Sequence, residues 1–104
     1  MKLNGLNVEI SSYTSEKLND ELVLYVEENR VISVLNQSAA VILGEIIRCF
    51  ETKTDCSTLD IAKVVYKYFD IADTTMDILS DIDETIALLE KAAIIKYVDE
   101  NLCQ

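Results

Sequence analysis

The stretch ISVLNQSAAVILGEI, residues 32–46, changes from a strand pattern to a helix pattern within a few residues. Residues 32–35 are mostly β-branched or apolar and favour a strand. From Gln37 onward, apolar residues recur at helical spacing and predict a buried stripe. Asn36 lies between the two patterns and suits a helix N-cap, because its side-chain oxygen can accept a backbone N–H of the first turn. The sequence therefore predicts a strand joined to a helix through Asn36, without Gly or Pro.

The segments before this joint predict two more strands. Residues 6–10 alternate apolar and polar, as a half-buried strand does, and residues 22–26 are rich in β-formers. Residues 27–29 are polar and suit a tight hairpin between residues 22–26 and residues 30–35. Residues 11–20 are rich in Ser, Thr, Asn, Asp and Lys and predict a loop. We expect one three-stranded antiparallel sheet with residues 30–35 at its edge.

Helical patterns fill most of the remaining chain. Ser57 followed by Asp60 resembles a capping box, and Asp73 or Thr74 suits the cap of a later helix. Residues 94–98 could form a short terminal strand or an apolar tail folded onto the core. The sequence predicts helices over about residues 37–50, 58–69 and 74–91. Strands followed by helices indicate one α+β domain spanning residues 1–104, for which a winged helix-turn-helix-like arrangement is one solution.

The charge of the chain restricts its partners. Among 104 residues there are 19 acidic and 9 basic side chains, a net charge of −10. Nucleic-acid affinity comes largely from Lys and Arg, so we expect no nucleic acid and favour an uncharged or basic protein or peptide. No apolar run is long enough to span a bilayer, and the N-terminal residues lack the apolar segment of a secretory signal. We therefore expect a cytoplasmic protein that does not bind membranes.

No motif for catalysis or for a cofactor stands out. The chain has no His, which excludes a Cys–His nucleophile pair and a Cys/His zinc site, and only two Gly, too few for a phosphate loop. We expect Cys49 to pack in the core and Cys56 and Cys103 to be incidental thiols. Ser38 or Ser57 could carry a prosthetic group, but hydroxyls at helix starts are usually caps. Acidic residues of the third helix could bind a hard cation, although a solvated face is the better interpretation. We expect no enzyme, metal or cofactor.

The third predicted strand is poorly protected for an edge. It contains no Pro and has Arg30 as its one charged residue, whereas edge strands usually carry charges that prevent pairing with other chains. An added peptide strand is a recurring occupant of such an edge. On the third helix, Ile78, Ile82 and Ile86 form the core face, and Leu79 continues it onto a shoulder of mixed character. We expect the strand and this shoulder to form a groove.

The segments LVLYVEENRVISVLNQSAAVILGEI (residues 22–46), STLDIAKVVYKYFDI (residues 57–71) and ILSDIDETIALLEKAAII (residues 78–95) resemble PqqD-like proteins, the precursor-peptide recognition domains of ribosomal peptide modification pathways. The similarity covers about residues 20–95, and its most specific part is LNQSAA at residues 35–40. Two glycines that are frequent in the family are absent, one between the first two helices and one before the final apolar pair, where Ala92 and Ala93 precede Ile94 and Ile95.

The resemblance implies a noncatalytic domain that binds the leader of a precursor peptide as an added strand beside the third helix. The domain would present that leader to a maturation enzyme, such as a radical SAM enzyme, a cyclodehydratase or a leader peptidase. A basic leader would bind more weakly as salt rises. Mapped onto this sequence, the expected peptide-binding residues are Arg30, Val31, Ile32, Ser33, Val34, Leu79, Asp83, Ile86, Ala87 and Glu90.

Two alternatives stay open. The same edge could pair with a second copy of the chain and give a homodimer. A winged-helix DNA-binding regulator would have the same order of helices, with residues 74–91 as the recognition helix. That helix carries several acidic residues against Lys91 alone, so phosphates should repel it from a major groove.

Overall fold

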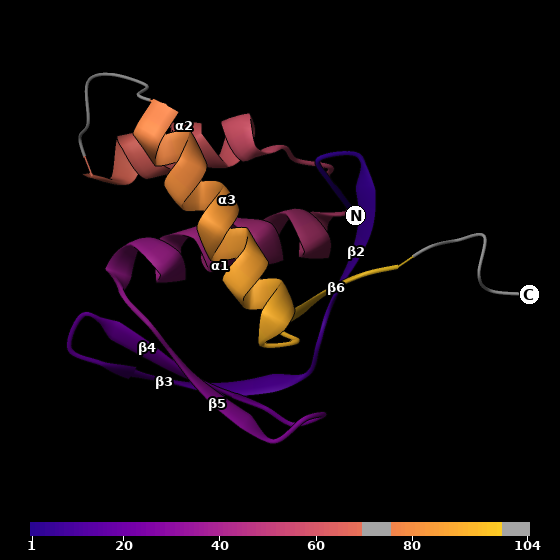
Figure 1. Ribbon diagram of the computed structural model, residues 1–104, viewed down its shortest axis with the longest axis vertical. Helices are drawn as coiled ribbons and strands as arrows, with labels where there is room; N and C mark the ends of the chain where they lie inside the picture. Colours follow the sequence, from indigo (N-terminus) through magenta and orange to yellow (C-terminus); the bar gives the residue numbers. More distant parts are fainter. Residues whose placement is uncertain (70–75, 99–104) are drawn as a thin grey trace, which may run out of the picture.

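A computed structural model describes residues 1–69 and 76–98 of the chain. It confirms the α+β class: three helices pack together, and two small antiparallel sheets lie against them (Figure 1). The strands are β1 (Lys2–Leu3), β2 (Leu6–Ile10), β3 (Tyr13–Leu18), β4 (Glu21–Val26), β5 (Val31–Leu35) and β6 (Ile95–Tyr97). The helices are α1 (Gln37–Thr52), α2 (Thr58–Phe69) and α3 (Met76–Lys91).

The larger sheet has the order β3-β4-β5, with β4 in the middle and antiparallel pairing throughout. Leu24 and Val26 of β4 are fully buried beneath the helices. Opposite them on β5 lie Ser33 and Val31, so these two residues share the inner face. Because side chains alternate along a strand, Ile32 and Val34 belong to the outer face.

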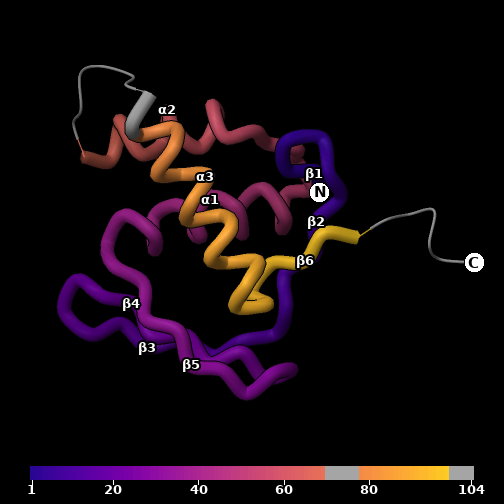
Figure 2. The backbone as a smooth tube through the Cα atoms, in the orientation of Figure 1, coloured from indigo at the N-terminus to yellow at the C-terminus, as the bar shows by residue number. Residues whose placement is uncertain are grey.

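The smaller sheet has the order β1-β2-β6 and joins the two ends of the chain. β6 follows α3 and runs beside β2 (Figure 2). Asn4 and Gly5, between β1 and β2, have φ angles of 53° and 81°, as a two-residue type I′ turn requires. The hydroxyl of Ser11 donates to the carbonyl of Ala93 at 2.5 Å and ties the end of β2 to the chain after α3. Of the two alternatives for residues 94–98, the short strand is the one that forms.

The prediction of one sheet containing residues 6–10, 22–26 and 30–35 is wrong. Residues 6–10 do form a strand, but it pairs with β1 and β6 instead of β4. The loop predicted over residues 11–20 is also wrong, because residues 13–18 pair with β4 along their whole length. This strand is almost entirely exposed, so backbone pairing maintains it without an apolar face, and its polar composition concealed it.

The helices follow the predicted pattern closely. The side chain of Asn36 accepts the N–H of Ala39 at 2.9 Å and confirms the N-cap of α1. The N–H of Ser57 donates to Asp60 at 2.9 Å, which confirms the capping box of α2. α1 extends two residues beyond the predicted end and stops at Lys53, which has a left-handed φ of 58°. The predicted caps of α3 at residues 73 and 74 lie outside the described residues.

The core lies where the three helices meet the two sheets. Every described helix and both sheets supply side chains to it. The smaller sheet therefore contributes to the core although its strands are short. In the described part of the chain, no helix is long and apolar enough to cross a membrane. The largest fully buried side chains are Leu3, Leu24, Leu43, Ile46, Ile61, Ile82, Leu89, Ile94 and Ile95.

Candidate functional site

The outer edge of β5 is open. Within the described residues β5 pairs with β4 alone, so its other row of backbone N–H and C=O groups has no strand partner. Its side chains are exposed for an apolar strand, at 39% for Val31, 66% for Ile32 and 56% for Val34. None of the residues of β5 is charged. Unpaired backbone groups beside exposed apolar side chains can accept an additional strand.

Both ends of β5 are fixed to the helical body. At its end, Asn36 continues directly into α1 as the N-cap. At its start, the side-chain amide of Asn29 donates to the carbonyl of Ala92 at 3.2 Å, just beyond α3. An ion pair between Glu28 and Lys96 ties the same turn to β6. The turn before β5 is therefore held against the C-terminal end of α3.

A groove of about 460 Å³ opens at the other end of β5. It begins at Asn36 and extends between the start of α1, the end of α2 and one flank of α3. Its floor is apolar, and carboxylates of α3 stand at its rim. The lining residues are Asn36, Ser38, Ile42, Val65, Phe69, Ile78, Asp81, Ile82, Glu84, Thr85 and Leu88.

These contacts place α3 alongside β5. The C-terminal end of α3 meets the turn that precedes β5 through Asn29, and the flank of α3 that lines the groove faces Asn36 at the other end of the strand. In Figure 1, α3 crosses in front of α1, and β5 runs below it toward the start of α1. The groove therefore adjoins the end of β5 at Asn36, although no residue of the strand itself lines it.

The α3 residues predicted from the sequence lie elsewhere on the helix. Asp83 accepts a hydrogen bond from the hydroxyl of Thr58 at 2.9 Å, at the start of α2. Burial raises the pKa of Tyr97 in β6, and the nearby carboxylates of Glu90 and Asp83 raise it further. The flank that includes Asp83 and Glu90 therefore faces β6 and the start of α2, away from the groove.

The remaining predicted residues divide between the two regions. Ile86 is 5% exposed and belongs to the core, Leu79 is partly buried, and Ala87 is exposed. Arg30 lies in the turn before β5, with φ of 57°, and is not part of the strand. The structure thus brings the predicted strand residues, Val31 to Val34, together at the open edge. It does not bring the predicted helix residues to the groove.

Sequence reasoning missed the α3 residues that do line the groove, notably Asp81, Glu84 and Leu88. Leu88 is 63% exposed and stands beside the apolar residues of the groove. A helical wheel places these residues on one shoulder of the buried stripe and Asp83 with Glu90 on the opposite shoulder. The available signal in the sequence was the position of Leu88 outside the buried stripe on the helical wheel.

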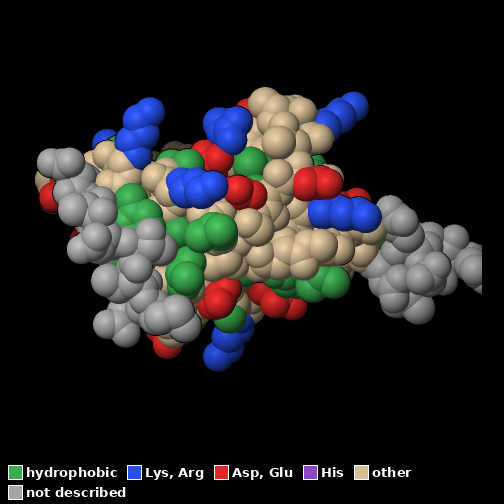
Figure 3. Space-filling model, turned by 90° about the horizontal axis from the view of Figure 1, so that it is seen from above, with side chains coloured by type: hydrophobic (Ala, Val, Ile, Leu, Met, Phe, Trp, Pro, Cys, Tyr) green, Lys and Arg blue, Asp and Glu red, His purple; other side chains and the backbone are tan. Residues whose placement is uncertain are grey.

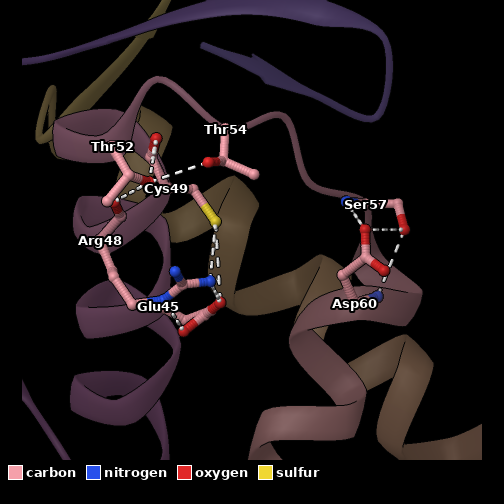
Figure 4. Close-up of polar contacts among 7 residues, drawn as sticks. All are labelled: Glu45, Arg48, Cys49, Thr52, Thr54, Ser57 and Asp60. Carbon is pink, nitrogen blue, oxygen red and sulfur yellow. Dashed lines mark hydrogen bonds and ion pairs between the residues drawn. The ribbon is translucent and has the colours of Figure 1, made fainter.

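The polar cluster at the end of α1 has a structural role (Figure 4). Arg48 donates two hydrogen bonds to Glu45, at 2.5 and 3.0 Å, and this pairing lowers the pKa of the Glu45 carboxyl. Cys49 is 1% exposed, which confirms its place in the core. Burial raises the pKa of Cys49 and raises that of Cys56 to about 12. Both thiols are therefore neutral at ordinary pH and are poor nucleophiles. Cys103 lies outside the described residues.

The charged side chains of the described residues outside the groove form no metal site. In the described part of the chain, no group of three or more acidic or cysteine side chains could hold a metal ion. Acidic and basic side chains are mixed on the face shown in Figure 3. The net charge of −10 therefore does not make the surface uniformly acidic, and the sign of charge at the groove depends on the residues that line it.

Comparisons with known proteins give no relative on which to base a function. The chain matches no protein-family model, no curated protein and no solved structure. The open edge of β5 and the adjoining groove are therefore the observations from which a function must be argued.

Proposed function

We propose that the protein binds a peptide as an additional strand along β5. The peptide would be the leader region of a ribosomally made precursor, which the protein presents to a modifying enzyme in the cytoplasm without catalysing the modification itself. The observation that supports this proposal is the open, uncharged edge of β5. The arrangement of strands and helices, interpreted as winged-helix-like, and the resemblance to PqqD-like domains agree with it.

The edge supplies the two components that strand addition needs. Main-chain hydrogen bonds along the ladder provide affinity without regard to sequence, and neighbouring side-chain pockets provide specificity. On β5 the outward row of backbone groups provides the first component. Val31 and Ser33 on the inner face and the groove beyond Asn36 are available for the second.

The alternative of a DNA-binding regulator has weaker support. The exposed side chains of α3 include Asp81, Asp83, Glu84 and Glu90, against Lys91 near its end. A recognition helix must approach base edges that are flanked by phosphates, which would repel this surface. A gel-shift assay with duplex DNA at low salt separates the two functions, because binding there would favour the regulator.

The direct test is titration with the leader of a short precursor peptide encoded beside this gene. We expect saturable binding by calorimetry, together with slower hydrogen–deuterium exchange at backbone amides of β5. No protection is expected in β3, which forms the opposite edge of the same sheet. A folded protein that gives no binding heat and no protection with this leader would contradict the proposal.

A further inference from the structure

We infer that the groove beyond Asn36 is an anchor site for a peptide that carries a bulky apolar residue next to Lys or Arg. This inference rests on the proposed strand addition, because the groove adjoins the end of the strand with which the peptide would pair. It concerns specificity, meaning which peptides this edge would retain, and it therefore has its own test.

The floor of the groove explains the apolar requirement. Ile42, Val65 and Phe69 come from two different helices and meet there, and Leu88 of α3 stands beside them, 63% exposed. The groove, at about 460 Å³, has room for a large side chain. Burying such a side chain against Leu88 would remove apolar surface of both partners from water, which is favourable.

The rim explains the basic requirement. Asp81 and Glu84 are exposed carboxylates of α3, and none of the residues that line the groove is Lys or Arg. A peptide with a basic residue next to its apolar anchor therefore meets only negative charge, whereas an acidic peptide is repelled. Two copies of a chain with net charge −10 also repel each other, which argues against a second copy as the occupant.

The position of the groove couples the anchor to the strand. A peptide that pairs with β5, which has 5 residues, and continues past Leu35 arrives at Asn36, where the groove begins. The anchor should consequently lie at one end of the paired segment and not within it. Whether it precedes or follows that segment depends on the direction of the added strand, which the position of the anchor would reveal.

The test uses a yeast-displayed library of random linear peptides sorted against the purified protein. We expect enriched peptides to share an extended alternating segment with an apolar residue and a Lys or Arg at one end. Dissociation constants of one enriched peptide are then measured for Leu88→Ser and for the double variant Asp81→Asn/Glu84→Gln. We expect roughly tenfold weaker binding for Leu88→Ser. For the double variant we expect about threefold weaker binding at low salt, with the difference lost near 1 M salt.

Matched variants control for general effects. Leu59→Ser removes an exposed leucine of α2, 50% exposed, that does not line the groove. Glu9→Gln/Glu51→Gln removes the same charge from two other exposed positions. Both controls should keep the wild-type dissociation constant within about twofold. All four proteins should unfold at the wild-type temperature, since every change is at an exposed or largely exposed side chain.

Three results would overturn the inference. Enriched peptides that bind Leu88→Ser and the double variant like wild type, yet lose binding when β5 is interrupted by proline, would leave strand addition intact and remove the anchor site. A wild-type dimer that Leu88→Ser converts to a monomer would show that a second copy fills the groove. A library that yields no peptide sensitive to the state of β5 would overturn the proposed function and the anchor site together.

Discussion

The two edges of the β3-β4-β5 sheet are equivalent in topology and different in chemistry. Each pairs with β4 on one side and has no strand partner on the other within the described residues. β3 carries Glu16 and Lys17 along a polar sequence, whereas β5 carries exposed Val31, Ile32 and Val34 and no charge. Charged side chains are the usual means by which proteins prevent an edge from pairing with other chains. The comparison shows that this sheet is protected on one side only.

The surroundings of the two edges also favour β5 as the edge that binds a peptide. β5 is fixed at both ends and lies along α3 and the groove. β3 begins near the link to the smaller sheet and is joined to β4 by a tight turn in which Asn19 has φ of 56°. The unprotected edge is thus also the one beside side chains that a peptide could contact, which is why we propose binding at β5 and not at β3.

The largest effect should come from proline at the two edges. Backbone N–H groups alternate in direction along a strand, so one of Ile32→Pro and Ser33→Pro removes a bond to β4 and the other blocks only the open edge. We expect the first to lower the free energy of unfolding by about 2 kcal/mol or more. The second should leave stability nearly unchanged and abolish peptide binding.

The matched pair on β3 is Thr14→Pro and Ser15→Pro. One of them should also destabilise the protein, and the other should leave both stability and peptide affinity at wild-type values. Chemical denaturation and calorimetric titration of all four variants check this. A β3 proline that abolishes binding in a folded protein would reverse the assignment of the edge.

The next effect should come from exchanging the protection of the two edges. Val34→Lys gives β5 a charge of the kind that β3 carries, and we expect peptide binding to weaken about fivefold through the loss of an apolar cross-strand contact of roughly 1 kcal/mol. Glu16→Thr/Lys17→Thr removes the charges of β3, and we expect more self-association at high protein concentration. Calorimetric titration measures the peptide affinity, and sedimentation velocity over a concentration series measures the self-association. If the β3 variant stays monomeric, charge is not what protects that edge.

A smaller effect should follow from loosening the joint at the end of β5. Asn36→Ala removes the N-cap of α1 and should lower the free energy of unfolding by about 1 kcal/mol. It should also weaken peptide binding, because the strand is then less firmly held. Ser57→Ala removes a cap of α2 and should cost about the same stability while leaving the affinity unchanged. If Asn36→Ala and Ser57→Ala have similar melting temperatures and lose the same peptide affinity, the joint at Asn36 has no particular role in peptide binding.

The smallest effect on peptide binding should come from a change that raises stability and leaves both edges alone. Ala93 has φ of 62°, a left-handed conformation that favours glycine, and Ala93→Gly should raise the free energy of unfolding by about 1 kcal/mol. Ala92→Gly, one residue earlier and without positive φ, should lower it by roughly 0.5 kcal/mol. Denaturant titration measures both changes, and peptide affinity should not change in either variant. A loss of stability in Ala93→Gly would mean that the side chain of Ala93 contributes more than the strain costs.

Local patterns in the sequence predicted the helices and the β4-β5 hairpin well. α2 begins and ends where its apolar stripe and capping box indicated, at Thr58 and Phe69. The open edge of residues 30–35 was also predictable, because it follows from consecutive hairpins and from a segment in which Arg30 is the one charged residue. The left-handed backbone at Ala93, with φ of 62°, was not predictable from the residue type, because glycine is the residue that usually adopts it.

The errors concern structure that depends on a pairing partner and not on the composition of the segment itself. β3 exists because its backbone pairs with β4, which its polar residues did not reveal. Asn4-Gly5 was a readable hairpin signal, yet the partner of β2 on its other side comes from β6, after the last helix. The choice of the wrong flank of α3 for peptide binding has the same origin. In the sequence, the two shoulders of the buried stripe have similar composition, and only the structure shows that β6 and α2 lie against one of them.

The hydrogen bond between the side chain of Asn29 and the carbonyl of Ala92 has a thermodynamic consequence for any peptide that binds β5. A strand secured at both ends has already given up its conformational freedom when the protein folds, so the receptor is preorganised. The loss of conformational entropy on association then falls almost wholly on the peptide. Rigidifying the peptide in an extended form should therefore raise the affinity more than rigidifying β5 would.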